Sequence, residues 1–120
     1  ADAAHALCSG VVVAHVRDAS VGPVTELNTH PFVHGPWLFA HNGTVARYEK
    51  HDRVRAALEA EIDRPLRYAI RGDTDSERCL YVLLTRLAAM VPAGTPPALE
   101  HVCAAMAQTI ATIVAVVTGS

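Results

Sequence analysis

The sequence predicts a mixed α and β fold in layers, with helices packed on a small sheet. Two short apolar runs, at 10–17 and 37–41, are rich in β-branched or aromatic residues and are typical of buried strands. Two longer segments, 74–90 and 98–113, carry apolar residues at helical spacing. An apolar run at 114–117 predicts a further strand, so the expected order is strand, strand, helices, strand.

Shorter features fill the intervals between these elements. Residues 54–62 have apolar side chains at helical spacing and predict a short helix. The following connector, 64–71, contains a run at 66–70 that is compatible with a short strand. Pro31 prevents the NTHPF segment at 28–32 from continuing a helix, and VPAGTPP at 91–97 predicts a loop.

The start of the first long helix is the most specific local signal. Residues 74–77 read TDSE, a capping-box pattern in which the Thr74 hydroxyl accepts from the Glu77 amide and the Glu77 carboxylate reaches back. We expect the helix that follows to bury the leucines at positions 80, 83, 84 and 87. Cys79 and Cys103 are expected to lie buried on the two long helices.

Composition restricts the class of protein. The chain has 120 residues, 51% hydrophobic and 18% charged, which is too apolar for a disordered segment. It is also more apolar than expected of a self-sufficient small domain, which suggests a missing covering layer. The net charge of −2, with scattered basic residues and 5% aromatics, argues against nucleic-acid binding.

Compartment and membrane signals are weak. Three cysteines without short spacing suggest neither a disulfide framework nor a thiolate zinc site, and a reducing cytoplasm fits. Residues 1–7 lack the basic start of a secretory signal. The uncharged stretch 102–120 is interrupted by polar residues and rich in alanine, so we expect a buried helix and strand and not a membrane span.

Four residue types together describe a pocket for an amino acid with a scissile carbonyl. Arg17 ends an apolar strand and could bind a carboxylate, although an internal ion pair would also explain it. Asn42 and Gly43 could donate two N–H groups to an oxyanion, or could form an ordinary hairpin turn. Asp73 and Asp75 flank Thr74; helix capping accounts for one of them, which leaves the other to bind an amine.

Histidines gather in the same part of the chain, at positions 15, 30, 34 and 41. Imidazole is a common metal ligand, so a zinc site is one alternative. Pro31 separates the one pair with helical spacing, and no acidic or thiol ligand completes a familiar pattern. We therefore expect no metal site and favour histidines that form hydrogen bonds to the backbone around a loop.

The three ordered motifs HVR (15–17), HNG (41–43) and TDSE (74–77) resemble those of the class II glutamine amidotransferases, a group of N-terminal-nucleophile hydrolases. The resemblance covers about 11–87 and is strongest to stand-alone bacterial members. It implies a four-layer αββα sandwich, of which residues 1–120 would be the central part, truncated at both ends. No cofactor is implied.

The resemblance also implies roles for individual residues. Arg17 would bind the α-carboxylate of glutamine, with Ser20 near that carboxylate, and Asp75 would hold the α-amino group. Asn42 and Gly43 would form the oxyanion hole. Asn28 and His30 occupy signature positions and are expected to be structural around their loop.

The nucleophile of this family is an N-terminal cysteine, whose own α-amine serves as the base. This chain begins with Ala1, and Cys8 lies too close to Arg17 for the family's spacing. We therefore expect a truncated chain that is inactive alone, whose parent releases ammonia and glutamate as a cytoplasmic glutaminase. The alternatives are a γ-glutamyl peptide amidohydrolase and a non-catalytic glutamine- or γ-glutamyl-binding module. A synthetase partner and a homo-oligomer both stay open.

Overall fold

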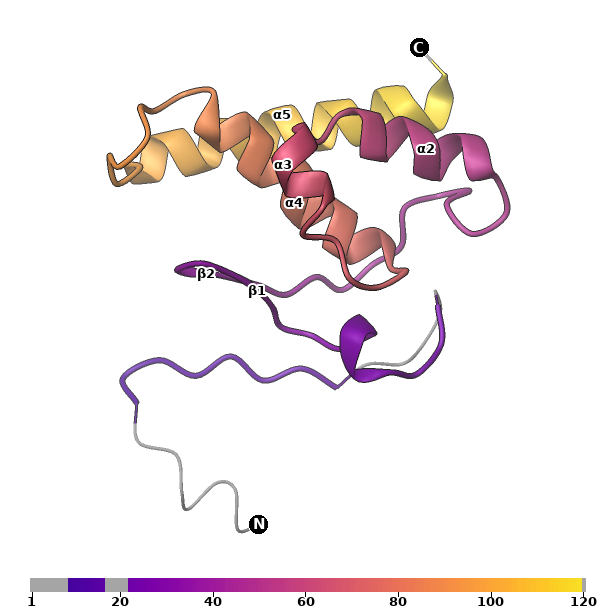
Figure 1. The fold of residues 1–120 in the computed structure, drawn as a ribbon, viewed down its shortest axis with the longest axis horizontal. Coiled ribbons are helices and arrows are strands. Elements are labelled where there is room, and N and C mark those ends of the chain that lie inside the picture. The colour runs from indigo at the N-terminus through magenta and orange to yellow at the C-terminus, as the bar shows by residue number, and fades with distance from the viewer. Residues whose placement is uncertain (1–8, 17–21, 120) are drawn as a thin grey trace, which may run out of the picture.

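The computed structural model describes residues 9–16 and 22–119. A layer of helices lies on one side of a small antiparallel hairpin (Figure 1). The elements in chain order are a 3-10 helix η1 (Glu26–Asn28), strands β1 (Phe32–His34) and β2 (Trp37–Phe39), and helices α2 (Asp52–Ala60), α3 (Arg64–Arg67), α4 (Asp75–Ala88) and α5 (Leu99–Thr118). The mixed α and β class is confirmed.

The hairpin combines one predicted strand with one that the sequence did not reveal. Strand β2 falls in the predicted segment 37–41, and it pairs antiparallel with β1, Phe32 opposite Phe39. The turn between them lies at Gly35 and Pro36, so Asn42 and Gly43 do not form a hairpin turn. Strand β1 follows Pro31 directly and is too short to show an alternating pattern in sequence.

The described part of the first predicted strand is not a strand. Residues 10–16 run as an unpaired segment below the hairpin (Figure 1). Val11 and Val16 are 81% and 97% exposed. A strand needs a neighbour that accepts and donates its backbone hydrogen bonds, and no described residue supplies one here. Arg17, the last residue of that prediction, lies outside the described residues.

Helix α4 is the centre of the helical layer and confirms the capping prediction. The Thr74 hydroxyl accepts from the Glu77 N–H at 3.2 Å. The Glu77 carboxylate reaches back further than expected, to the N–H groups of Arg71 and Gly72 at 3.1 and 2.8 Å. Leu80, Leu84 and Leu87 are buried as predicted, while Leu83 is half-buried.

The two shorter helices give one confirmation and one correction. Helix α2 confirms the helix predicted at 54–62, within two residues at each end, and buries Val54 and Leu58. The strand that the run 66–70 suggested is wrong, because 64–67 forms α3 with Pro65 at its start. Proline is well accommodated in the first turn of a helix, where its missing N–H is not needed.

Helix α5 corrects two further predictions. It continues through 114–117, where a strand was expected, and most of it is exposed rather than buried. The hydroxyls of Thr109 and Thr118 donate to carbonyls four residues earlier, so these hydroxyls are satisfied within the helix. Cys103 is helical, as predicted, but it is exposed, whereas Cys79 on α4 is buried.

Two apolar clusters hold the layers together, and Phe39 of the hairpin packs against both. The first joins α2, α4 and the end of α5, including Val54, Leu58 and Cys79. The second joins β1, α4 and the segment around α3, including Phe32 and Tyr81. Burying such side chains contributes about 1.5–3 kcal/mol each to folding. The HNG segment begins two residues after the end of β2.

Candidate functional site

The HNG segment follows β2 and lies next to the first turn of α4. Asn42 and Gly43 are exposed, and the Asn42 side chain has no hydrogen bond to a described residue. A Cβ on Gly43 would lie 3.0 Å from Nε2 and 3.3 Å from Cε1 of His41, so the imidazole already fills that space. Both predicted oxyanion donors are thus accessible, and glycine lets the His41 ring lie close to the backbone.

Three hydrogen bonds attach residues 41–48 to residues 73–76. The Val45 N–H donates to Asp75 Oδ2 at 2.6 Å. The Nδ1 atom of His41 lies 2.8 Å from Ser76 Oγ. Further along the loop, the Tyr48 hydroxyl donates to the Asp73 carbonyl at 2.8 Å. Two motifs that are 30 or more residues apart in sequence are therefore held side by side.

Asp75 is more enclosed than sequence reasoning anticipated. It is 2% exposed, and its other oxygen, Oδ1, accepts the Ser76 N–H at 2.9 Å. Each carboxylate oxygen thus already accepts one backbone N–H, although a carboxylate has about four acceptor positions. Asp73 is the accessible acid of the pair, with 55% of its side chain exposed and Arg55 at 4.0 Å. The interaction of Asp75 with an amine stays a prediction.

Asn28 joins the NTHPF segment to the same site. It is fully buried, its Oδ1 accepts the Asp73 N–H at 2.8 Å, and its Nδ2 donates to the Pro23 carbonyl at 2.9 Å. Its expected structural role is confirmed. His30 is also buried, and its ring stacks on that of His15 with centroids 4.1 Å apart.

The predicted carboxylate-binding residues, Arg17 and Ser20, lie outside the described residues, as does Cys8. Burial, reinforced by the charge of Asp75, raises the pKa of the Cys79 thiol from 9.0 to about 12. A thiol with so high a pKa is a poor nucleophile near neutral pH. Cys79 is therefore a structural residue.

The described histidines do not gather around a metal. No group of three or more His, Cys, Asp or Glu side chains within 9–16 and 22–119 is arranged to hold an ion. His41 contacts Ser76, and His34 lies 3.3 Å from the Tyr81 hydroxyl through Nδ1. These two histidines form hydrogen bonds to side chains, whereas we expected hydrogen bonds to the backbone around a loop.

Comparison with known proteins identifies the family. A model described as glutamine amidotransferases class-II matches residues 3–117. The chain belongs to the class II glutamine amidotransferases. No solved structure matches it.

Individual relatives of this class II glutamine amidotransferase are similar over part of their length. The Escherichia coli protein YafJ is 38% identical over 85 residues, 68% of this chain and 29% of that protein. The glutamine–fructose-6-phosphate aminotransferase (isomerizing) of Wigglesworthia glossinidia brevipalpis is 38% identical over 65 residues, 54% of this chain and 9% of that enzyme. The chain thus spans less than a third of the length of these relatives.

Several residues that build the site of this amidotransferase chain were not singled out for that role. Ser76 and Tyr48 bind the HNG loop and the TDSE segment together, and Val45 contributes only its backbone. The capping box predicted where α4 begins, but no sequence signal shows which loop packs against the first turn of α4. Such long-range pairing depends on how the hairpin folds under the helices.

Helix α5 has the length and composition of a membrane-crossing segment. Its 20 residues include an 18-residue window of mean hydropathy 1.7, of which 11% is buried. Core helices of soluble proteins can meet the same criteria, and α5 packs against α2 and α4. The expectation that it does not span a membrane stays a prediction.

Proposed function

We propose that the protein carrying this domain is a cytoplasmic glutaminase, which hydrolyses the side-chain amide of glutamine to glutamate and ammonia. The observation that carries the proposal is the attachment of the exposed Asn42–Gly43 segment to the first turn of α4, through the Val45–Asp75 and His41–Ser76 hydrogen bonds. An amide and a backbone N–H held on a fixed loop are suited to receive a developing oxyanion.

In this mechanism an N-terminal cysteine thiolate attacks the side-chain carbonyl of glutamine. The negative charge moves to the carbonyl oxygen, where Asn42 Nδ2–H and the Gly43 N–H stabilise it. The tetrahedral intermediate collapses to a thioester and expels ammonia, which carries the proton passed on through the α-amine. Water then attacks the thioester, releases glutamate and restores the thiol.

Arg17 binds the α-carboxylate of glutamine in this proposal, with Ser20 beside it. The planar guanidinium matches a carboxylate through paired N–H groups. Asp75 receives the α-amino group if its remaining acceptor positions become accessible in the complete domain. The complete domain adopts the four-layer αββα sandwich, and the ammonia passes to a synthetase partner or to solvent.

The test is steady-state kinetics of the full-length protein, with glutamate release measured from glutamine and from a γ-glutamyl dipeptide. Asn42→Ala should lower kcat by about 100- to 1000-fold with little change in KM, because it removes one oxyanion donor. Arg17→Ala should mainly raise KM. Gln108→Ala, on the exposed side of α5, is the control and should retain activity.

The outcomes separate the alternatives. An unchanged kcat in Asn42→Ala would remove the oxyanion assignment. Faster turnover of the dipeptide than of glutamine would identify a γ-glutamyl peptide amidohydrolase. Tight glutamine binding with no glutamate release would identify the non-catalytic binding module. A free cysteine at the natural N-terminus, read by Edman sequencing, would support the glutaminase.

A further inference from the structure

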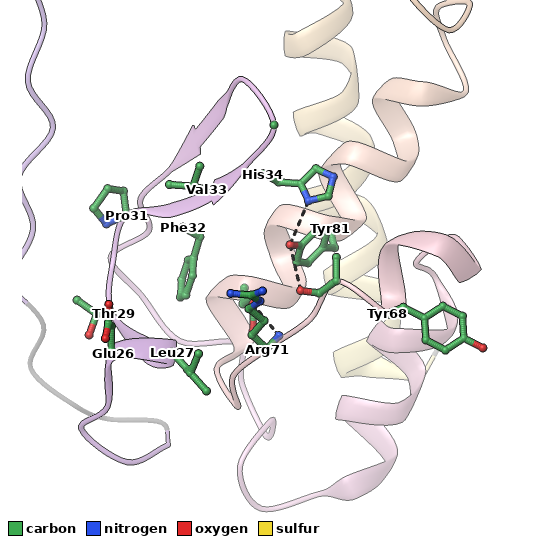
Figure 2. Close-up of a pocket in the computed structure, with 13 residues that line it drawn as sticks. Glu26, Leu27, Thr29, Pro31, Phe32, Val33, His34, Tyr68, Arg71 and Tyr81 are labelled. Carbon is green, nitrogen blue, oxygen red and sulfur yellow. Dashed lines mark hydrogen bonds between the residues drawn. The ribbon is translucent and has the colours of Figure 1, made fainter.

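A cleft lies away from the HNG loop, between the η1–β1 segment and the α3–α4 segment. It is a cleft of about 660 Å³, within the 300–1,000 Å³ of small-molecule sites. Figure 2 shows Glu26, Thr29 and Pro31 on one wall and Tyr81 of α4 on the other, with His34 pointing from the end of β1 towards Tyr81. Neither Asn42, Gly43 nor Asp75 lines it, so it is separate from the proposed glutamine site.

Arg71 lies in this cleft, with its side chain between Leu27 and Tyr81 (Figure 2). Its guanidinium forms no ion pair with any described carboxylate. By contrast Arg55, Arg78 and Arg86 are each paired with a glutamate. An unpaired guanidinium in a concave site presents planar N–H donors that fit a carboxylate or phosphate.

The backbone that carries Arg71 is held firmly. Glu77 accepts the N–H groups of Arg71 and Gly72 with its two oxygens, so this one of the two carboxylates that line the cleft is already engaged. A Cβ on Gly72 would lie 2.3 Å from Asn28 Oδ1 and 2.6 Å from the Leu27 carbonyl, which shows how closely the two walls approach. A receptor held in place before binding loses less entropy when the ligand arrives.

His34 and Tyr81 supply further polar groups to the cleft. The Nδ1 atom of His34 lies 3.3 Å from the Tyr81 hydroxyl, which also lies 3.4 Å from the Ala69 carbonyl, and the two rings meet edge to face. Burial and the charge of Glu77 raise the pKa of Tyr81, and the charge of Arg71 opposes them. The phenol is therefore a neutral donor near the Arg71 cation at physiological pH.

We propose that this cleft binds the oxyanion of a small molecule, either a carboxylate or a phosphate, with Arg71 as its principal anchor and His34 and Tyr81 as hydrogen-bonding partners. Glu26 is the acid on the opposite wall. It repels the anion and limits its affinity. The proposal is independent of glutamine hydrolysis, because it uses none of the residues assigned to that reaction.

The experiment is a calorimetric titration of the full-length protein with inorganic phosphate and, separately, with malonate. Arg71→Gln should weaken binding at least tenfold, whereas Arg71→Lys should weaken it less because the charge remains. Arg64→Gln is the matched control, since Arg64 is exposed, is outside the cleft and has no ion pair to a described residue; it should change affinity less than twofold. Glu26→Gln should tighten binding.

Binding of malonate alone would identify a carboxylate ligand, and binding of phosphate alone a phosphorylated one; either supports the site. Equal weakening by Arg71→Gln and Arg64→Gln would overturn it, because only bulk charge would then matter. The proposal would also be overturned if neither anion bound at concentrations up to about 10 mM, which corresponds to an affinity on the order of millimolar. Thermal unfolding of each variant checks that the fold is retained.

Discussion

The imidazole of His41 and the hydroxyl of Ser76 meet at 2.8 Å, across 35 residues of sequence. His41 also packs against Gly43, so one side chain contacts both the proposed oxyanion segment and the first turn of α4. The position of Asn42 and Gly43 therefore depends on a contact that neither motif contains by itself. The following predictions test this and related contacts.

His41→Ala and Ser76→Ala should destabilise the protein non-additively. Because each removes the same hydrogen bond, the double variant should lose less stability than the sum of the two, with a coupling of about 0.5–1.5 kcal/mol. This coupling is measured by urea unfolding of the parent protein, the two single variants and the double variant. The control combines His41→Ala with Thr95→Ala, an exposed loop residue that lines no cavity together with His41, so that the effects should add. Additivity in the first cycle as well would contradict the contact.

Asp75→Asn should destabilise the fold by about 1–3 kcal/mol, because an amide nitrogen would face a backbone N–H that now donates to a carboxylate. Asp73→Asn is the matched control. Its side chain is 55% exposed and its pair with Arg55 is long, so the change should stay within about 0.5 kcal/mol. Chemical denaturation compares the two, and equal effects would show that Asp75 is not held as described.

Gly72→Ala should destabilise by about 2–3 kcal/mol. Its Cβ would overlap Asn28 Oδ1 and the Leu27 carbonyl, and a backbone atom cannot move aside cheaply. Gly10→Ala is the control, because nothing lies within 4 Å of a Cβ there. The melting temperature of each variant is the measurement. A Gly72→Ala protein as stable as the parent would mean that the two segments approach less closely.

Thiol labelling at pH 8 should separate the two described cysteines. Cys103 is exposed and should react rapidly with iodoacetamide, whereas Cys79 is buried with a pKa of about 12 and should react at least 100-fold more slowly. Peptide mapping by mass spectrometry identifies the labelled site. Labelling in urea is the control, since both thiols should then react at similar rates.

Stability should fall as the pH rises from about 9 towards 12. The Cys79 thiol ionises near 9 in the unfolded chain and near 12 in the folded one, so the unfolded state releases its proton first and is favoured in between. Tyr48 acts in the same direction, because burial raises its pKa from 10.0 to about 12. Cys79→Ala should flatten the decline and Cys103→Ala should not, in denaturation at pH 8, 9.5 and 10.5.

Local patterns predicted the helices well. The Thr74–Glu77 capping box and the leucine spacing located α4, because helix formation depends mainly on interactions between residues three or four apart. Strands were predicted poorly, since a strand exists only where a partner supplies its hydrogen bonds. The valine-rich run at 10–16 has no such partner among the described residues, and 114–117 continues a helix.

The sequence by itself determined the family motifs, the mixed α and β class, the start of α4 and the residue types of the proposed oxyanion hole. The tertiary structure decided which acid is accessible, Asp73 and not Asp75, and which side chains join HNG to TDSE. It also placed Arg71 in a cleft, without an ion pair to any described carboxylate. The reason is physical: burial, ion pairing and contacts between distant segments arise only when the chain packs, and spacing along the sequence does not encode them directly.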